Sequence, residues 1–255
     1  MARIPDHACV GLGGNTLNRA PMAAVFELIR QGRTHLHLVK TAGGMDIDAL
    51  CLAGCAETVD AGFISYESRY GLAQHYRRAV QSGQVQAHEH ACYTVISALR
   101  AASYGIPFMP VRGLRETDLR GVNDYFADVR DPFSGETLAA VRALHPDYSI
   151  LHVHSADRFG NAVIEGPKYD DVLLSRASAK VILTAERIVP DAFFSASPVK
   201  ADIPHFLVSA VVPLRRGAQP CACMPDYGPD DPEIRSFLAL ADRDALLGWL
   251  ERRHV

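Results

Sequence analysis

The regular alternation of short apolar runs with longer amphipathic segments over residues 1–111 is the feature that most constrains this fold. Apolar runs such as 8–12 and 35–40 have the length and composition of buried strands. The segments between them carry apolar residues at helical spacing, and the first of these, 21–32, has a proline in its opening turn and a glycine at its end. The sequence therefore predicts an α/β fold with an open, mostly parallel sheet covered by helices.

Residues 112–147 break this pattern, because they are polar, rich in turn residues and poorly periodic. Long loops in compact domains are usually functional or disordered, so this segment is expected to be an irregular excursion around the mouth of a site. Residues 1–255 are expected to form one domain. The other strands are expected at 58–65, 84–89, 106–111, 148–156, 162–166, 179–186 and 205–213. The other helices are expected at 46–54, 71–83, 90–105, 170–178, 231–241 and 243–254.

Composition and charge exclude several classes of protein. The net charge of −3 gives no broad basic surface for nucleic acid or an anionic membrane. The longest apolar runs, such as 205–214, are too short to span a bilayer, and the first residues lack the basic and apolar regions of a signal peptide. The expected location is therefore the cytoplasm. The six cysteines show neither a disulfide framework nor zinc-finger spacing, so we expect free thiols and no bound metal.

The stretch GLGGNTLNRAP, residues 11–21, places three glycines where a strand meets a helix. A dinucleotide-binding loop requires a third glycine at the position of Thr16 and an acidic residue near Lys40, so NAD binding is not expected. Two interpretations stay open. Either the glycines only close a tight turn, or their N–H groups hold a thioester oxyanion or a phosphate beside a helix N-terminus.

The stretch HVHSAD, residues 152–157, suggests a metal site, because an H-x-H pair on a strand directs both imidazoles to one face. His152 and His154 would then serve a metal-dependent hydrolase. The other ligands of such an enzyme are not evident, and His35 and His37 repeat the same spacing. Histidines that are packed or hydrogen-bonded are the favoured interpretation.

Two charged residues near strand ends are candidates for a site. Glu89 lies where a strand meets the long helix 90–105. It either complements the helix dipole or offers a carboxylate at the sheet edge where open α/β sheets bind ligands. Arg69 follows another strand and could clamp a substrate carboxylate, although a solvated surface arginine is the more common outcome.

Taken together, these segments resemble the family I coenzyme A transferases, specifically the A subunits of the glutaconate CoA-transferase type. The resemblance covers nearly the whole chain, and its specificity lies in the order and spacing of the motifs. The motifs are GLGGNTLNRAPMA, TAGGMDIDALCLAG, AGFISYES, HYRRAVQSG, ALRAASYGIPFMPVR, ETDL, ADRFGNAVIEG, AKVILTAERIV and GAQPCACMPDYG.

The resemblance implies a heteromeric enzyme in which a homologous B subunit is the partner and the active site lies at the interface. The implied reaction is acyl-CoA:carboxylate CoA transfer on a dicarboxylate or 3-oxo acid, through a glutamyl-CoA thioester formed mainly on the B subunit. The CoA thioester is a substrate, and no permanent cofactor or metal is implied. Gly13, Gly14 and Asn15 would line the acyl-CoA site with backbone and amide donors, and Arg69 is a weaker candidate for a carboxylate contact. Glu89 is the only carboxylate of this chain that we consider for catalysis.

Two departures from the family pattern keep alternatives open. The chain starts almost at its first strand, where family members usually carry a helix, so the outer layer is expected to be incomplete or covered by a partner. A related branch, the steroid ring-cleaving hydrolases, carries an acidic residue at or near the position of Cys92, and a thiol cannot replace a carboxylate base. The alternatives are a CoA-thioester or ring-cleaving C–C hydrolase subunit, or a non-catalytic subunit that has lost activity.

Overall fold

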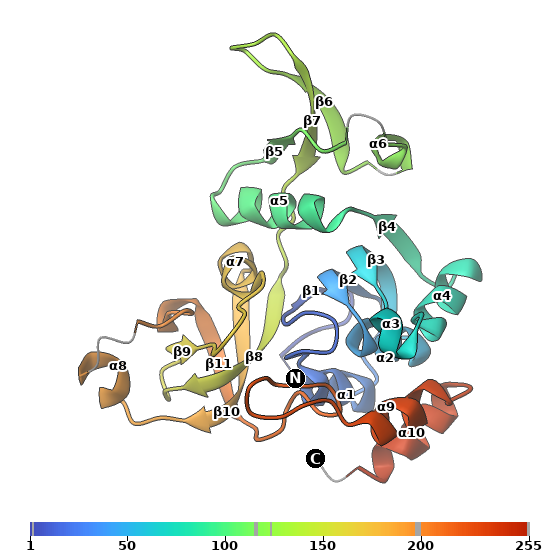
Figure 1. The fold of residues 1–255 in the computed structure, drawn as a ribbon, viewed down its shortest axis with the longest axis vertical. Coiled ribbons are helices and arrows are strands. Elements are labelled where there is room, and N and C mark those ends of the chain that lie inside the picture. The colour runs from blue at the N-terminus through green and yellow to red at the C-terminus, as the bar shows by residue number, and fades with distance from the viewer. Residues whose placement is uncertain (2, 115–116, 123, 197–199, 254–255) are drawn as a thin grey trace.

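A sheet of eight strands runs through the middle of the described part of the molecule (Figure 1). The computed structural model describes residues 1, 3–114, 117–122, 124–196 and 200–253. Seven strands follow the order β11-β10-β8-β1-β2-β3-β4, in which all neighbours are parallel, and the short β9 adds to β8 in the antiparallel direction. The strands are β1 (Cys9–Leu12), β2 (Leu36–Gly43), β3 (Ala56–Ile64), β4 (Gln86–Glu89), β8 (Tyr148–Ala156), β9 (Ala162–Val163), β10 (Lys180–Ile188) and β11 (Val208–Pro213). The predicted α/β class is confirmed.

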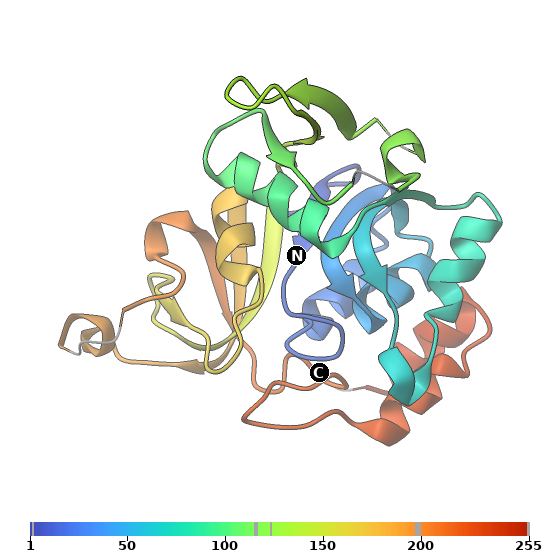
Figure 2. The ribbon, with the colours of Figure 1, turned by 45° about the horizontal axis from the view of Figure 1, so that its top comes forward.

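Helices cover both faces of this sheet, and Figure 2 shows α5, in green, lying across the strands. One hydrophobic core joins the sheet to α1 (Met22–Arg30), α2 (Met45–Leu52), α9 (Asp231–Leu238) and α10 (Arg243–Glu251). A second core joins the opposite face to α5 (Cys92–Ser103) and α7 (Asp171–Ala177). The remaining helices of the described residues are α3 (Glu67–Tyr70), α4 (Gln74–Gln81), α6 (Leu119–Val122), α8 (Ala192–Ala196) and the 3-10 turn η1 (His205–Leu207).

The central strands are apolar on both sides because both faces are covered. In β2, Leu38 packs in the core under α1 and α2, and the next residue, Val39, packs in the core under α5 and α7. On the outer side of the first core, the Phe26 ring of α1 stands edge-on to Trp249 of α10, with 5.6 Å between the ring centroids. The two C-terminal helices therefore form part of the outer layer on this face.

The segment predicted to be an irregular excursion contains regular structure. β6 (Phe126–Arg130) and β7 (Thr137–Arg142) form an antiparallel hairpin, and β5 (Phe108–Val111) pairs with β7. The expectation that residues 106–111 extend the parallel sheet is therefore wrong, because β5 belongs to this separate three-stranded sheet. The segment has a polar composition because the hairpin projects into solvent, where Phe133 near its tip is 96% exposed.

β1 lies where the chain changes its direction of travel across the sheet. From β1 the chain continues through β2, β3 and β4 to one side, whereas β8, β10 and β11 lie on the other side. Loops that leave such a switch point diverge, and open α/β sheets bind ligands there, at the carboxyl ends of the strands. The glycine-rich stretch is the loop that follows β1, so the fold places it at the expected position of a site.

Two expectations from composition can be compared with the structure. All six cysteines are free thiols; Cys51 is buried on α2, whereas Cys55 is buried beyond the end of that helix. None of the helices formed by the described residues combines the length and the apolar character that crossing a membrane requires.

Candidate active site

In the loop after β1, the backbone N–H groups of Gly13 and Gly14 donate hydrogen bonds to acceptors within the chain. Gly13 donates its N–H to the carbonyl oxygen of Ile150 at 3.0 Å. Gly14 donates its N–H to Oδ1 of Asp171 at 2.6 Å. Both N–H groups therefore have acceptors within the chain, and their contact with a thioester stays a prediction. Asn15, which is half-buried on the same loop, carries a side-chain amide that can still serve as a donor.

Close packing explains why glycine occupies these two positions. A Cβ atom at Gly13 would lie 2.5 Å from Cδ2 of Leu151. Gly14 has a φ of +74°, and a Cβ atom there would lie 2.5 Å from backbone atoms of Arg19. Only glycine combines this backbone conformation with this approach. The structure thus supports the interpretation in which the glycines close a tight turn.

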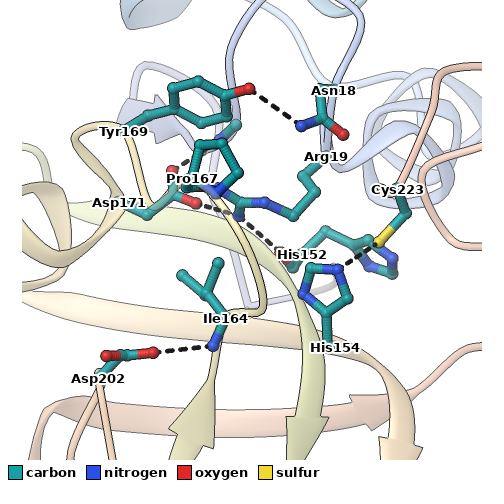
Figure 3. A network of polar contacts seen from close by, with 12 residues as sticks. Asn18, Arg19, His152, His154, Ile164, Pro167, Tyr169, Asp171, Asp202 and Cys223 are labelled. Atoms are coloured by element: carbon teal, nitrogen blue, oxygen red, sulfur yellow. Dashed lines mark hydrogen bonds and ion pairs between the residues drawn. The ribbon is translucent and has the colours of Figure 1, made fainter. Parts of the chain in front are cut away.

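A buried ion pair fixes the end of this loop (Figure 3). The Arg19 guanidinium pairs with Asp171, and both side chains are fully buried. The same guanidinium donates to the carbonyl oxygens of His152 at 3.3 Å and Pro167 at 2.8 Å. Because Asp171 also accepts the N–H of Gly14, the pair connects the loop after β1 to the start of α7.

A second buried ion pair holds the loop from the other side. Nζ of Lys40 lies 3.1 Å from Oδ2 of Asp46 and donates to the carbonyl oxygen of Gly13. Asp46 in turn accepts the N–H of Gly44 at 2.9 Å through Oδ1. The lysine that argues against a dinucleotide site therefore positions the glycine loop.

His152 and His154 are buried and hydrogen-bonded, as the favoured interpretation predicts. Nδ1 of His152 lies 2.8 Å from Oγ1 of Thr184, and its Nε2 lies 2.8 Å from Oε1 of Glu186. Nδ1 of His154 accepts the N–H of Glu165 at 3.0 Å, which leaves the ring proton on Nε2. These imidazoles connect β8 to β10 and to the segment after β9.

Two left-handed residues that are not glycine meet at the carboxyl edge of the sheet. Thr16 in the loop after β1 has a φ of +44°, and Glu67, the first residue of the short helix α3 that follows β3, has a φ of +57°. The Thr16 hydroxyl donates to Oε1 of Glu67 at 3.3 Å. A left-handed backbone costs about 1–2 kcal/mol for an L-residue, and a β-branched residue such as threonine adopts it least readily. Residues held in this way concentrate at functional sites.

Short hydrogen-bonded turns hold this pair in place. Thr16 donates its N–H to the carbonyl oxygen of Ala42 at 2.9 Å. Glu67 donates its N–H to Oγ of Ser65 at 3.1 Å, and the Ser65 hydroxyl donates to the carbonyl oxygen of Gly71 at 2.9 Å. Glu67 is exposed, so a fixed backbone presents its carboxylate to solvent.

Glu89 and Arg69 lie apart from the loop after β1. Glu89 ends β4 and lines a hollow of about 210 Å³ together with Phe63 and Tyr76, and this hollow includes no residue of that loop. The Arg69 guanidinium pairs with Asp231 of α9, so a substrate carboxylate would have to displace that partner. The structure thus brings together Gly13, Gly14 and Asn15, but neither of these two charged candidates joins them. Their roles stay predictions.

Sequence reasoning missed Glu67, although it considered the neighbouring Arg69. The decisive feature is the left-handed backbone, and glutamate is not a residue type that indicates this conformation. The remaining signal is position, because Glu67 lies shortly after the end of β3, as Glu89 lies at the end of β4.

Cys92 is the first residue of α5, beside the carboxyl end of β2. Its thiol donates to the carbonyl oxygen of Thr41 at 3.5 Å. Burial raises the pKa of the Cys92 thiol above its ordinary value, so the side chain is a neutral thiol at neutral pH. A neutral thiol cannot accept a proton as a carboxylate base does.

Comparison with known proteins relates this architecture to one family. The model of the family described as Coenzyme A transferase matches residues 1–213. A protein of Archaeoglobus fulgidus is 36% identical over 93% of this chain, which spans about half (53%) of that protein. The A subunit of the glutaconate CoA-transferase of Acidaminococcus fermentans is 31% identical over 91% of this chain and 77% of that protein. The cholesterol ring-cleaving hydrolase IpdA subunit of Mycobacterium tuberculosis is 31% identical over all of this chain and 89% of that protein.

Two solved structures have closely similar folds. The glutaconate coenzyme A-transferase of Acidaminococcus fermentans gives a TM-score of 0.91 at 27% identity and covers 98% of this chain and 84% of its own. The decarboxylase AibA/AibB gives a TM-score of 0.89 at 35% identity and covers 98% of this chain and 94% of its own. One fold therefore serves a transferase, a hydrolase and a decarboxylase among the relatives.

Proposed function

This chain belongs to the coenzyme A transferase family, in the branch formed by its A subunits, and we propose on that premise that it is one half of a two-subunit enzyme acting on a CoA thioester. The observation that carries the proposal is the contact of Thr16 with Glu67 at the carboxyl edge of the sheet. Both residues are held left-handed, and the carboxylate is exposed at the place where open α/β sheets bind ligands. We propose Glu67, rather than Glu89, as the carboxylate that this chain contributes.

Exposed apolar side chains near this edge support a partner subunit. Phe63 at the end of β3 is 43% exposed, Leu72 in the following loop is 51% exposed, and Tyr93 in the first turn of α5 is 52% exposed. Apolar and aromatic side chains exposed around a polar centre are typical of interaction surfaces. A homologous B subunit seated on this edge would cover them and separate the Glu67 carboxylate from bulk water.

The proposed transfer divides the chemistry between the two subunits. A glutamate of the B subunit attacks the thioester carbonyl, and the CoA thiolate leaves. The thiolate then attacks the glutamyl carbonyl of the mixed anhydride, which forms a glutamyl-CoA thioester and releases the donor acid. The acceptor carboxylate attacks that thioester and expels the CoA thiolate, which attacks the acceptor carbonyl of the second anhydride to give the new acyl-CoA and the free glutamate. In this chain Glu67 is a positioning group that accepts hydrogen bonds from N–H groups of the pantetheine arm, and Asn15 offers an amide donor beside it. The acid substrates would be a dicarboxylate or a 3-oxo acid.

A hydrolytic reaction is the second candidate, and the exposed Glu67 carboxylate favours it. In hydrolysis, water replaces the acceptor acid, and a carboxylate must take a proton from that water. Cys92 cannot supply this base because its thiol is neutral, whereas Glu67 can. The IpdA relative shows that the family includes hydrolases.

The deciding experiment uses this chain co-expressed with a homologous B subunit. The complex is incubated with glutaconyl-CoA, with and without a carboxylate acceptor, and both free CoA and the new thioester are measured. A transferase forms the new thioester only with the acceptor present. Release of free CoA at the same rate without an acceptor would establish hydrolysis, and activity of this chain alone would contradict the two-subunit proposal.

A pair of matched variants tests the assignment of the carboxylate. Glu67→Gln keeps the size of the side chain and removes its charge. We expect it to lower kcat/KM by about tenfold in the transfer reaction, where the carboxylate positions the substrate, and by at least about 100-fold in hydrolysis, where the carboxylate is the base. Glu89→Gln is the control on the neighbouring strand, and we expect it to stay within about threefold of the unmodified complex. The reverse result would transfer the role to Glu89.

A further inference from the structure

Three histidines surround one buried aspartate toward the β4 edge of the sheet, on the face that α5 covers. His37 of β2, Asp60 of β3 and His88 of β4 come from three adjacent parallel strands, and Asp60 stands directly opposite His88 in the register. His90 follows β4 and completes the group. Neither the glycine loop nor Glu67 is part of this cluster.

All three imidazoles direct a ring nitrogen at the Asp60 carboxylate. Nε2 of His90 lies 3.0 Å from Oδ1, Nδ1 of His88 lies 3.3 Å from the same atom, and Nε2 of His37 contacts Oδ2. Asp60 and His90 have fully buried side chains, whereas those of His88 and His37 are 17% and 26% exposed. One nitrogen or oxygen atom from each of His37, Asp60 and His88 lies within 4.8 Å of the other two.

This donor set exceeds what a buried carboxylate needs. One cationic partner compensates its charge, yet three imidazoles converge here, and imidazole is the commonest metal ligand in proteins. Ligand atoms of a tetrahedral zinc ion stand about 3.3–3.4 Å apart, given bonds of about 2.0–2.1 Å. The separation of His88 from Asp60 has this value. We propose that the cluster binds a divalent transition-metal ion of the zinc class, with His37, Asp60 and His88 as ligands.

Outer contacts of the kind that orient metal ligands are present. The Tyr125 hydroxyl donates to Oδ2 of Asp60 at 3.4 Å, and Nδ1 of His90 lies 3.3 Å from Oγ1 of Thr94. Such partners fix the ring orientation and the carboxylate geometry around a metal.

The cluster lies beside the hollow that Glu89 lines. His88 and His90 both direct a ring nitrogen at Asp60, whereas Glu89 between them lines the hollow that also includes Tyr76 and His90. The partly exposed rings of His37 and His88 give an ion a route from solvent. The ion would connect three strands of the sheet and is not assigned a step in the reaction.

The test uses the full chain in complex with its co-expressed partner subunit, stripped with EDTA and then titrated with Co²⁺. We expect one equivalent of Co²⁺ to bind with the visible absorption of a low-coordinate site, and Zn²⁺ to displace it. His88→Ala and His37→Gln should each weaken Zn²⁺ binding by at least about tenfold. His37→Gln changes a partly exposed side chain, so it keeps the test valid if His88→Ala does not fold.

A second histidine group provides the matched control. His7, His35 and Glu57 also place ligand atoms within 4.8 Å of one another, but all three residues are exposed. His35→Ala should therefore leave the cobalt absorption and the stoichiometry unchanged. The proposal is overturned if the unmodified complex shows no cobalt absorption, if His37→Gln and His88→Ala both retain it, or if His35→Ala abolishes it.

Discussion

The loop after β1 and the loop after β3, which leads into α3, meet at the carboxyl edge of the sheet. The buried ionisable groups that pack behind these two loops differ, because those behind the first keep their charges and those behind the second shift toward their neutral forms. Behind the first loop, buried charges are paired. Arg19 pairs with Asp171 and Lys40 pairs with Asp46, and each of these side chains is at most 1% exposed. The pairs also bind backbone groups of the loop, so the charges contribute directly to its shape.

Behind the second loop, buried ionisable groups shift toward their neutral forms. Burial raises the pKa of Asp48 on α2 to about 6. Burial and the neighbouring Arg78 cation lower the pKa of His75 on α4 to about 4. Asp48 accepts hydrogen bonds from the Tyr66 hydroxyl at 3.0 Å and from the N–H of Tyr76 at 2.7 Å, but it has no cation in direct contact within the described ranges.

The difference shows when a protein interior keeps a charge. Moving a charged side chain from water into the protein interior is costly. A buried group therefore stays charged only where an opposite charge and hydrogen bonds compensate the cost, and otherwise its pKa shifts so that the neutral form is favoured. The first region is therefore a fixed frame that resists changes of pH. The second region responds to pH, and it supports the loop that carries the exposed Glu67.

Removing one partner of the buried ion pairs behind the first loop has the largest expected effect on the free energy of unfolding. Asp171→Ala leaves the buried guanidinium of Arg19 without a counter-charge and the N–H of Gly14 without an acceptor. We expect a loss of about 3–5 kcal/mol in the free energy of unfolding, measured by urea denaturation. The double variant Arg19→Met with Asp171→Leu removes both charges and should lose clearly less. Equal losses in the single and double variants would show that the pair does not fix the loop.

The pH response of the second region is the next largest effect. His75 has a lowered folded pKa, so the unfolded chain takes up its proton first, and its stabilising contribution is lost as the pH falls from about 6.5 to about 4. Asp48 has a raised folded pKa, so the folded chain takes up its proton first, and stability increases as the pH falls from about 6 to about 3.8. In the unmodified protein the contributions of His75 and Asp48 to the free energy of unfolding therefore oppose each other as the pH falls.

Replacing either residue alone should therefore reveal how much that residue contributes to the pH dependence of the free energy of unfolding. Between about pH 7.5 and 4.5, His75→Phe should gain about 2–3 kcal/mol in the free energy of unfolding relative to the unmodified protein, and Asp48→Asn should lose about 2 kcal/mol. Urea denaturation at both pH values measures the difference, and all other titrating groups cancel in the comparison. A pH-independent difference for His75→Phe would show that His75 titrates normally.

Much of the fold can be predicted from the sequence because its signals are local. Strand and helix periods identify β1–β4 with their helices, and the covered faces explain why both sides of β2 are apolar. The hairpin of β6 and β7 could not be predicted in this way. Its exposed residues give a polar pattern, and its pairing with β5 depends on contacts between distant segments.

The site could be predicted only in part, for a related reason. Position at a strand end is visible in the sequence and selected Glu89, Arg69 and the glycine loop. The left-handed backbone of Glu67 and the acceptors of the glycine N–H groups depend on tertiary contacts. The histidine cluster also escaped prediction. His88 and His90 have the H-x-H spacing, but His37 and Asp60 come from two other strands, and only the pairing of these strands brings the four residues together.

A comparison of two glycines measures how tightly the first frame packs. Gly14 and Gly32 both have left-handed backbones, with φ of +74° and +63°, but a Cβ atom would meet the Arg19 backbone only at Gly14. Gly32→Ala should cost about 1 kcal/mol for the backbone conformation alone. Gly14→Ala should cost about 2 kcal/mol more, because the added methyl overpacks the turn. Equal costs in thermal unfolding would show that the loop has room to relax.

The smallest expected effect concerns strain at Glu67. Glu67→Gly relieves the left-handed conformation of the glutamate but adds freedom to the unfolded chain, and the balance should stabilise the protein by about 0.5 kcal/mol. The same variant should lose the activity of the complex as Glu67→Gln does. Ser68→Gly, at the next residue of α3 without a left-handed backbone, is the control and should destabilise by about 0.5–1 kcal/mol. If both variants lose stability equally, the backbone at Glu67 is not strained. If Glu67→Gly is more stable and inactive, the conformation is maintained for function at a cost in stability, which distinguishes this loop from the frame beside it.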